Sequence, residues 1–242
     1  HYWMNLFAEL ETRDFLDIHV INPMIIHARR NETIRGAKTD RIDSYRIAQY
    51  SREVDHRSSA LPNDETSELR RFARLRYDLA QRASAMKLQI ISYLDIVFPE
   101  YINHFNDIFG ISSRRLLEDY PTADMIAKVD TRKLTRVLKA ASRGRLGRDK
   151  AQQLKKSATQ SFASKSSSEA MQISIRFTVQ QLNMLLDQIK QLEEMTASFL
   201  VEQQEILKSI PGIGDVYAPA ILAEVLPVFH PELRTGADKL VA

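Results

Sequence analysis

The feature that most constrains the fold is a long stretch, Glu169–Ser209, which contains neither glycine nor proline. Its apolar residues repeat on the a and d positions of a heptad, interrupted by Thr196 and Gln203: Leu182, Leu185, Ile189, Leu192, Phe199 and Ile206. This period predicts one long helix whose apolar seam packs against another helix. The partner is either residues 68–98 of the same chain, in a hairpin, or a second copy in a coiled coil. The sequence favours neither.

Residues 68–98 form the other strongly helical stretch, which ends at Phe98-Pro99. Its apolar positions follow the helical period: Leu69, Phe72, Leu75, Leu79, Met86, Ile90 and Leu94. Shorter helices are expected beyond it, separated by Gly110, by Tyr120-Pro121 and by the segment 143–148. Residues 157–168 are rich in serine and predict a flexible hinge.

Composition removes several classes of site. The chain of 242 residues has 7 glycines and no cysteine, and no glycine-rich nucleotide-binding loop is present. Disulfides, thiol catalysis and cysteine-ligated metals are therefore excluded. The histidines form no paired metal motif, and we expect His19 in a strand, His27 in a loop and His104 on the surface. No apolar run approaches the roughly 18 residues of a membrane span, so we expect a soluble cytoplasmic protein.

The first 55 residues differ in pattern from the rest. Residues 1–13 have a helical spacing of apolar positions, whereas Phe15–Pro23 is rich in branched residues and predicts a strand ending in a turn. A polar loop at 28–38 and a helix opening at Thr39 follow. This order is typical of an α/β domain, and residues 56–67 predict a polar linker after it.

The segment Lys38–Ser44 holds two acids at a distinctive spacing. Thr39 is placed to cap the helix, so Asp40 and Asp43 fall in its first turn and on one face. Two carboxylates placed in this way suit Mg²⁺, as phosphoryl transfer requires. The alternative is that the helix dipole alone favours these acids, and spacing by itself favours that alternative.

Charge is strongly segregated along the chain. The net charge is only +3, but residues 128–156 carry eleven Lys and Arg against Asp130 and Asp149, which gives +9 there and −6 elsewhere. Such a block is typical of proteins that bind a phosphate backbone, although a solvated helix face is the alternative. We expect its exposed members to contact nucleic acid: Arg132, Lys133, Arg136, Lys139, Arg143, Arg145 and Arg148. A second basic cluster indicates the same kind of partner, since only Asp78 opposes it in the local sequence: Arg70, Arg71, Arg74, Arg76, Arg82 and Lys87.

Residues 210–225 read Ile-Pro-Gly-Ile-Gly and then start another helix. This pattern predicts a helix-hairpin-helix unit in which Gly212 and Gly214 let backbone N–H groups approach a phosphate. An ordinary tight turn between packed helices is the alternative.

Four motifs in this order resemble a known family: HYWMNL, HVINP, GAKTDRIDSYRIA and IPGIGDVYAPAILAEV. They are similar to the bacterial insertion-sequence transposases of the DEDD/serine type, the bridge-RNA-guided recombinases. The resemblance implies the end of a RuvC-like (RNase H fold) domain in residues 1–55, a helical and coiled-coil region in 68–209 and the start of a C-terminal transposase domain in 210–242. The fold class expected is therefore mainly α, with an α/β remnant at the N-terminus.

The resemblance also implies roles for particular residues. Asp40 and Asp43 match the third and fourth acids of the family's Mg²⁺ site. Apart from the resemblance, Lys38 and Arg41 flank these acids in the sequence, and we expect them to contact phosphate. The family's first two acids and its serine nucleophile have no counterpart here, and no serine of this chain is assigned that role. We therefore expect an inactive fragment of a longer enzyme.

The expected function of the parent protein is cleavage and rejoining of DNA strands. The expected partners are DNA, a guide RNA and further copies paired through residues 169–209, in the bacterial cytoplasm at the nucleoid. The alternative function is a helical module that binds DNA or RNA, or that dimerises, without chemistry.

Overall fold

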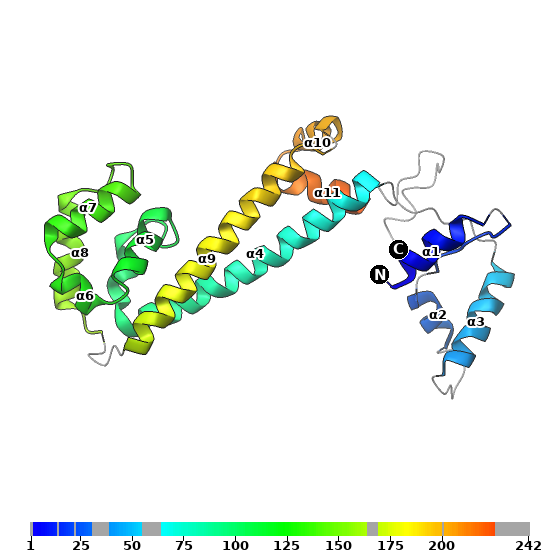
Figure 1. Cartoon of the computed structure of the whole chain (residues 1–242), viewed down its shortest axis with the longest axis horizontal. Helices are drawn as coiled ribbons and strands as arrows, with labels where there is room; N and C mark the ends of the chain where they lie inside the picture. The colour runs from blue at the N-terminus through cyan, green and yellow to red at the C-terminus, as the bar shows by residue number, and fades with distance from the viewer. Residues whose placement is uncertain are drawn as a thin grey trace. The chain divides into compact units, whose positions relative to one another are not determined.

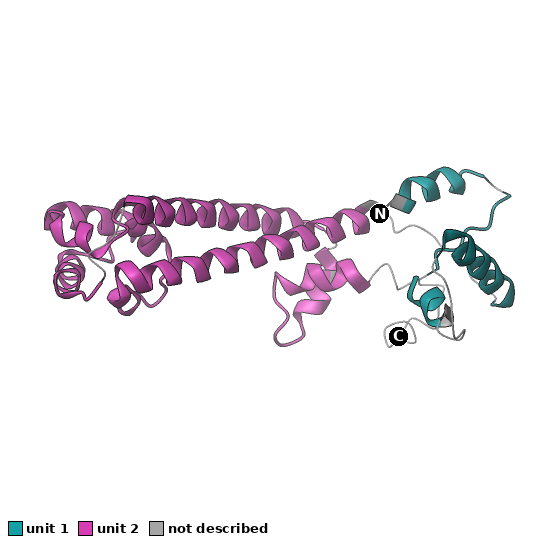
Figure 2. Ribbon diagram, turned by 90° about the horizontal axis from the view of Figure 1, so that it is seen from below, with its two compact units in different colours: residues 1–63 teal, residues 64–242 magenta. Residues whose placement is uncertain are grey.

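The computed structural model describes residues 2–13, 15–21, 23–30, 39–54, 64–163, 169–199 and 201–225. They belong to two compact units, residues 1–63 and 64–242 (Figure 2), and each unit is described by itself. Across these described ranges the structure has eleven α-helices, one 3₁₀ helix and no strand. The mainly α class is therefore confirmed.

The first unit contains α1 (Tyr2–Glu11), α2 (Pro23–Arg30) and α3 (Asp40–Glu53). The predicted strand at Phe15–Pro23 is wrong, because residues 15–21 have no regular structure and α2 begins at Pro23. A strand needs a neighbouring strand to satisfy its backbone, and the described residues of this unit supply none. Proline also suits the first helical position, where its missing N–H costs nothing. The described part of the unit therefore does not show the expected RNase H-like remnant.

The second unit is organised by a hairpin of two long antiparallel helices, α4 (Asp64–Val97) and α9 (Glu169–Thr196), which lie side by side (Figure 1). Their seam is fully or almost fully buried and includes Leu79, Ile90 and Leu94 of α4 with Ile175, Val179 and Leu182 of α9. The intramolecular hairpin is thus the arrangement that this structure adopts.

The sequence analysis predicted the C-terminal end of α4 correctly but not its N-terminal end. The helix stops at Val97, before Phe98-Pro99, as predicted, and η1 (Pro99–His104) follows. It begins earlier than predicted, at Asp64, so residues 64–67 belong to a helix and not to the linker. Thr66 is 6% exposed, and its burial against the unit explains the extra turn.

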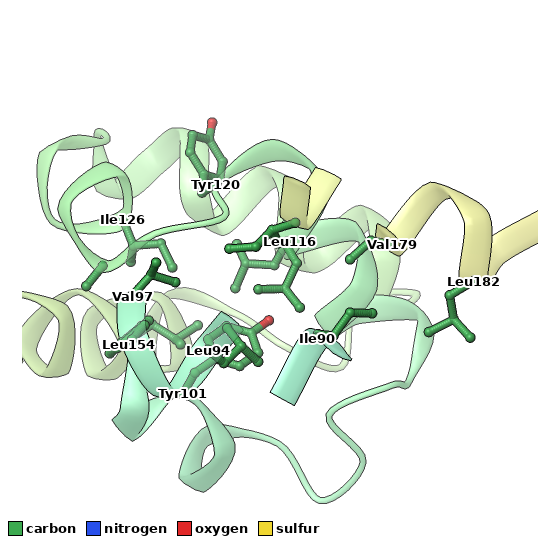
Figure 3. Packing of buried hydrophobic residues seen from close by; sticks show 14 of the residues in the cluster. Ile90, Leu94, Val97, Tyr101, Leu116, Tyr120, Ile126, Leu154, Val179 and Leu182 are labelled. Atoms are coloured by element: carbon green, nitrogen blue, oxygen red, sulfur yellow. The ribbon is translucent and has the colours of Figure 1, made fainter. Parts of the chain in front are cut away.

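A helical lobe, residues 99–160, packs around one end of the hairpin (Figure 1). It comprises η1, α5 (Ile111–Asp119), α6 (Ala123–Lys128), α7 (Thr131–Ala141) and α8 (Arg148–Gln160). Figure 3 shows its core, where Tyr101, Leu116, Ile126 and Leu154 meet Leu94. The Tyr101 hydroxyl donates to the Ser113 carbonyl oxygen at 3.0 Å, and complete burial raises its pKa well above the ordinary value. One satisfied polar group thus ties η1 to α5.

The predicted hinge at 157–168 is wrong over its first four residues, because α8 continues to Gln160. Ala158 is 7% exposed and belongs to the core, and the Thr159 hydroxyl donates to the Lys155 carbonyl. Core packing therefore extends the helix into the serine-rich segment. Residues 161–163 are irregular, and 164–168 lie outside the described residues.

The prediction of one long helix from Glu169 to Ser209 is also wrong. The helix α9 ends at Thr196, and two further helices follow, α10 (Val201–Lys208) and α11 (Tyr217–Val225). The Gln204 amide, 2% exposed, donates to the carbonyl oxygens of Thr196 at 3.0 Å and Phe199 at 2.5 Å. These bonds satisfy carbonyls that a continuing helix would have used. Phe199 still packs edge-on against Phe72, whereas Ile206 is 69% exposed and outside the seam.

The helix α11 docks on the first turns of α4. Leu69, Leu222 and Ala223 are buried between them. At the edge of this contact, Glu224 accepts hydrogen bonds from Arg70 and Arg74, with shortest distances of 2.8 Å to each. The two guanidinium groups, Arg74 first, lower the pKa of Glu224 to about 2.

The seam predicts a clear stability contrast on α9. Leu182 is fully buried, so Leu182→Ala leaves a cavity between α4 and α9 and should lower the free energy of unfolding by about 2 to 5 kcal/mol. Met184 is 55% exposed, and Met184→Ala should change it by less than about 0.5 kcal/mol. Urea unfolding followed by circular dichroism measures both. Equal effects would contradict the hairpin seam.

The Glu224 contact predicts a pH-dependent contribution to stability. Its folded pKa, about 2, is below the usual 4.5, so the stabilisation is complete above that usual value and is lost as the pH falls toward 2. Because the side chain is 46% exposed, solvent screens the pair, and we expect Glu224→Gln to cost about 1 kcal/mol near neutral pH.

Urea unfolding at about pH 7 and about pH 2.5 measures this contribution. The loss should shrink strongly at the lower pH. Glu194→Gln, which removes only a pair with Lys190 on the same helix, is the control and should change little at either pH. A loss of equal size at both pH values would show that the charge of Glu224 is not the cause.

Candidate nucleic-acid interface

The start of α3 has the local structure that the sequence predicts. Thr39 is the N-cap, and its hydroxyl accepts a hydrogen bond from the Ile42 N–H at 3.4 Å. Asp40 and Asp43 occupy the first turn, one turn apart on the same side of the helix. Arg41 lies between them and is exposed, whereas Lys38 lies outside the described residues.

Asp43 lines a hollow of about 450 Å³ in the first unit. Arg46 lies one turn further along α3, with its Nη1 3.7 Å from an Asp43 carboxylate oxygen. Two histidines from other segments line the same hollow: His19 precedes α2 and lies 3.0 Å from an Asp17 carboxylate oxygen, and His27 is on α2. The assignments of His19 to a strand and of His27 to a loop were both wrong. Their meeting with Asp43 depends on how α2 folds back on α3, for which the sequence carries no signal.

The two carboxylates at the start of α3, of which Asp43 alone lines the hollow, fit a divalent cation in part. Asp40 and Asp43 offer the hard oxygen ligands that Mg²⁺ prefers, at a spacing that places both on one face. Among the residues that the structure describes, no group of three or more acids, histidines or cysteines is placed to hold a metal. These two carboxylates are therefore at most part of a site.

The basic block 128–156 falls within the helical lobe, and its densest part is α7. Asp130 caps this helix by accepting hydrogen bonds from the backbone N–H groups of Arg132 and Lys133. Leu134 and Leu138 are fully buried on one face, while four cations are exposed on the other: Arg132, Lys133, Arg136 and Lys139. The amphipathic pattern thus fixes an outward cationic row.

Some cations of this block have contacts inside the lobe. Lys128 forms an ion pair with Asp124 at 2.7 Å, and the Lys155 ammonium donates to the Val129 carbonyl oxygen at 2.5 Å. Apart from Lys128 and Lys155, two further cations of this block have a contact inside the lobe: Arg145 donates to the Ser142 carbonyl oxygen at 3.3 Å, and the Lys150 ammonium lies 5.3 Å from the centre of the Phe105 ring. No ion pair with a carboxylate of the described ranges is found for the nine cations other than Lys128 and Lys155: Arg132, Lys133, Arg136, Lys139, Arg143, Arg145, Arg148, Lys150 and Lys156. The charge excess seen in the sequence is therefore also a local excess in space.

The second basic cluster does not behave in the same way. Arg70 and Arg74 are bound by Glu224, and Arg76 pairs with Glu193 at 2.7 Å. The compensating acids are more than a hundred positions away, so the local sequence could not reveal them. This cluster is mainly part of the fold, and the expectation that it marks a phosphate surface is corrected for these three residues.

The segment 210–225 contains a tight turn, which follows α10, and the helix α11. Gly212 has φ +94°, a conformation that favours glycine, and nothing lies within 4 Å of the position its Cβ would take. Gly214 is exposed, and its carbonyl accepts the first hydrogen bonds of α11 from Tyr217 and Ala218. Lys208 of α10 lies 2.8 Å from Asp215, which neutralises the nearest cation. The turn is thus sterically open but is not cationic.

No helix in the described ranges is long and apolar enough to cross a membrane.

Comparison with known proteins gives one match. Residues 1–99, which include the acids of α3, match the family model of the DEDD transposases of the IS110 type, described as a transposase. No curated protein and no solved structure matches the chain. Residues 1–99 are therefore an IS110-family DEDD transposase domain.

Proposed function

We propose that this chain acts in DNA transposition, where its helical lobe binds the phosphate backbone of nucleic acid. The observation that carries the proposal is the cationic row of α7, which has no carboxylate partner among the described residues and lies in a chain whose N-terminal part is a transposase domain. Transposases act on DNA, so an unmatched row of cations has a natural partner in the phosphate backbone.

The geometry of α7 suits a backbone contact. Arg132, Arg136 and Lys139 follow one another at intervals of about one helical turn, so their attachment points extend over about 10 Å of one helix face. A duplex strand carries one phosphate per about 3.4 Å of its axis, and several phosphates can therefore be neutralised together. Contacts of this kind position nucleic acid without reading its sequence. Arg143, Arg145 and Arg148, in the turn that follows α7 and at the start of α8, extend the same surface.

A guide RNA is proposed as a second partner on the resemblance of the motifs. Phosphate contacts do not discriminate RNA from DNA, so the same lobe serves either. Gly212 and Gly214 are proposed as a further, uncharged backbone contact at the turn between α10 and α11.

Asp40 and Asp43 are proposed as ligands of Mg²⁺. When bound, Mg²⁺ stabilises negative charge on phosphoryl oxygens during strand cleavage. Arg46 holds Asp43 through their ion pair, and Arg41 projects from the same turn toward solvent as a phosphate contact. The serine attack that completes the proposed strand exchange is assigned to no residue of this chain.

We propose that two copies of the chain pair through α9, but through a different face of this helix than its heptad seam. The heptad seam at Leu182, Leu185 and Leu192 is already buried within the unit, largely against α4. Contact with a second copy would therefore use the opposite face, where Ile173, Phe177 and Met184 are exposed.

A second candidate function is a helical module that binds nucleic acid without chemistry. The α7 row supports it equally, because backbone binding needs no metal. A cation-binding role for Asp40 and Asp43 is the property that separates the two candidates.

The first test concerns the cationic row. Replacing Arg132, Arg136 and Lys139 by Gln should weaken binding to a blunt DNA duplex and reduce the slope of log affinity against log salt by up to about three, because each phosphate contact contributes about one. Fluorescence anisotropy between about 50 and 200 mM salt measures both quantities.

The matched control replaces Arg71, Arg82 and Lys190, three exposed cations of α4 and α9, by Gln. It removes the same charge and should leave the salt slope close to that of the original chain. Equal losses in the two triple variants would reduce the effect to net charge and contradict a specific surface on α7.

The second test concerns the metal. Asp43→Asn, and separately Asp40→Asn, should weaken binding of Mn²⁺, used in place of Mg²⁺ because water-proton relaxation reports it directly. Asp95→Asn on α4 is the control, since this exposed acid lies in the other unit. Mn²⁺ binding that is unchanged in both α3 variants would remove the metal assignment and favour the module without chemistry.

A further inference from the structure

A second hollow, which we term the basic hollow, lies in the helical lobe between two turns. One side is the segment 104–113, which joins η1 to α5, and the other is the segment 141–150, which joins α7 to α8. Its volume is about 660 Å³, and the residues that matter for its chemistry are His104, Phe105, Asp107, Arg143, Arg145 and Lys150.

Three cations converge on this hollow. Arg143 and Arg145 are exposed at the turn, while Lys150 is half-buried, with its ammonium 5.3 Å from the centre of the Phe105 ring. No carboxylate of the described ranges forms an ion pair with any of them. Burial lowers the pKa of Lys150, which fits an ammonium that has lost water without gaining an anion. An anion entering the hollow would supply the missing partner.

The backbone at Arg143 argues that its side chain has a role. The residue has φ +52°, in the left-handed region, directly after the last turn of α7. The Gly144 N–H donates to the Lys139 carbonyl at 2.8 Å, and the buried Ser142 hydroxyl accepts from the Leu146 N–H at 2.8 Å. Helices that close in this way usually have glycine at the position of Arg143. An arginine held there by its neighbours is the kind of strained residue that clusters at binding sites.

The hollow is larger than a phosphate alone requires. Its volume lies within the range of about 300 to 1,000 Å³ that is typical of small-molecule sites. The segment 104–113 contributes Phe105, His104 and Asp107 to its lining. Burial and the nearby Lys150 lower the pKa of His104, which favours a neutral ring that can both donate and accept. Asp107 is held by the Phe109 N–H at 2.8 Å and keeps a carboxylate oxygen for donors.

We propose that the basic hollow binds one unpaired nucleotide of a single-stranded nucleic acid, with the phosphate on Arg143, Arg145 and Lys150 and the base beside Phe105 and His104. The two arginines come from the segment 141–150, whereas the only lining carboxylate among the described residues, Asp107, comes from the segment 104–113, and this difference in charge favours the orientation. The inference rests on the proposed function in one respect, that the lobe's partner is nucleic acid. It adds that an unstacked base is held as well as the backbone.

The experiment compares four probes on the full chain by anisotropy: a single-stranded DNA of thymidines, a uridine RNA of equal length, an abasic strand with the same number of phosphates, and a blunt duplex. The thymidine or uridine strand should bind about tenfold tighter than the abasic strand, because one held base contributes on this scale. Asn106→Leu and Ser112→Leu fill the hollow without changing charge, and each should abolish this preference while leaving duplex binding unchanged.

Arg143→Gly supplies an independent readout. Glycine adopts the left-handed backbone conformation of this position without strain, so the melting temperature should not fall. The loss of the guanidinium group should weaken binding of the single strands by about fivefold. Arg132→Gln removes the same charge from α7 and should weaken all probes alike, keeping the preference for strands with bases. Tighter binding of RNA than of DNA identifies RNA as the source of the nucleotide, and the reverse identifies DNA.

Two results would overturn the inference without touching the proposed function: equal binding of abasic and base-bearing strands, or a preference that survives both filling variants, each with duplex binding intact. If the original chain binds neither the duplex nor any strand, the proposed function itself fails.

Discussion

The packing of α9 on α4 is the interaction on which the rest of the second unit depends. Both helices are amphipathic, and neither can remain in water alone without exposing a long apolar stripe. Closing the seam brings the lobe to one end of the hairpin, and α10 and α11 to the other (Figure 1). One polar contact joins α4 to α9, and another joins α9 to α5 in the lobe. In the first, Arg76 binds Glu193, and in the second, Arg176 donates to the Glu118 carbonyl.

The two basic clusters differ in whether their cations form ion pairs within the unit. Near α11, arginines meet carboxylates that the chain brings from far away, and the charges are satisfied within the unit. On α7 the buried face is formed by leucines, and the cations on the other face are exposed to solvent. A count of charges along the sequence cannot distinguish these cases, because ion pairs depend on tertiary contacts.

Helix caps and helix ends that depend on single residues could be predicted from the sequence. Features that depend on contacts between distant segments could not. The Thr39 cap, the end of α4 at Pro99 and the boundaries at Gly110 and Pro121 follow from the backbone preferences of single residues, and these predictions are confirmed. The break after Thr196 depends on one glutamine reaching back to two carbonyls, and the strand at Phe15 failed where no described neighbour pairs with it. The basic hollow could have been suspected only from Arg143 beside Gly144, because its other wall comes from a different part of the chain.

The length of α9 sets how much of a nucleic acid could lie along this helix. Its 28 residues rise about 1.5 Å each, so the helix is roughly 42 Å long. That span equals about twelve base pairs of duplex at about 3.4 Å each. A duplex that lies along α9 and touches both ends of this helix must therefore be longer than one turn of DNA, and a shorter one can reach only one end at a time.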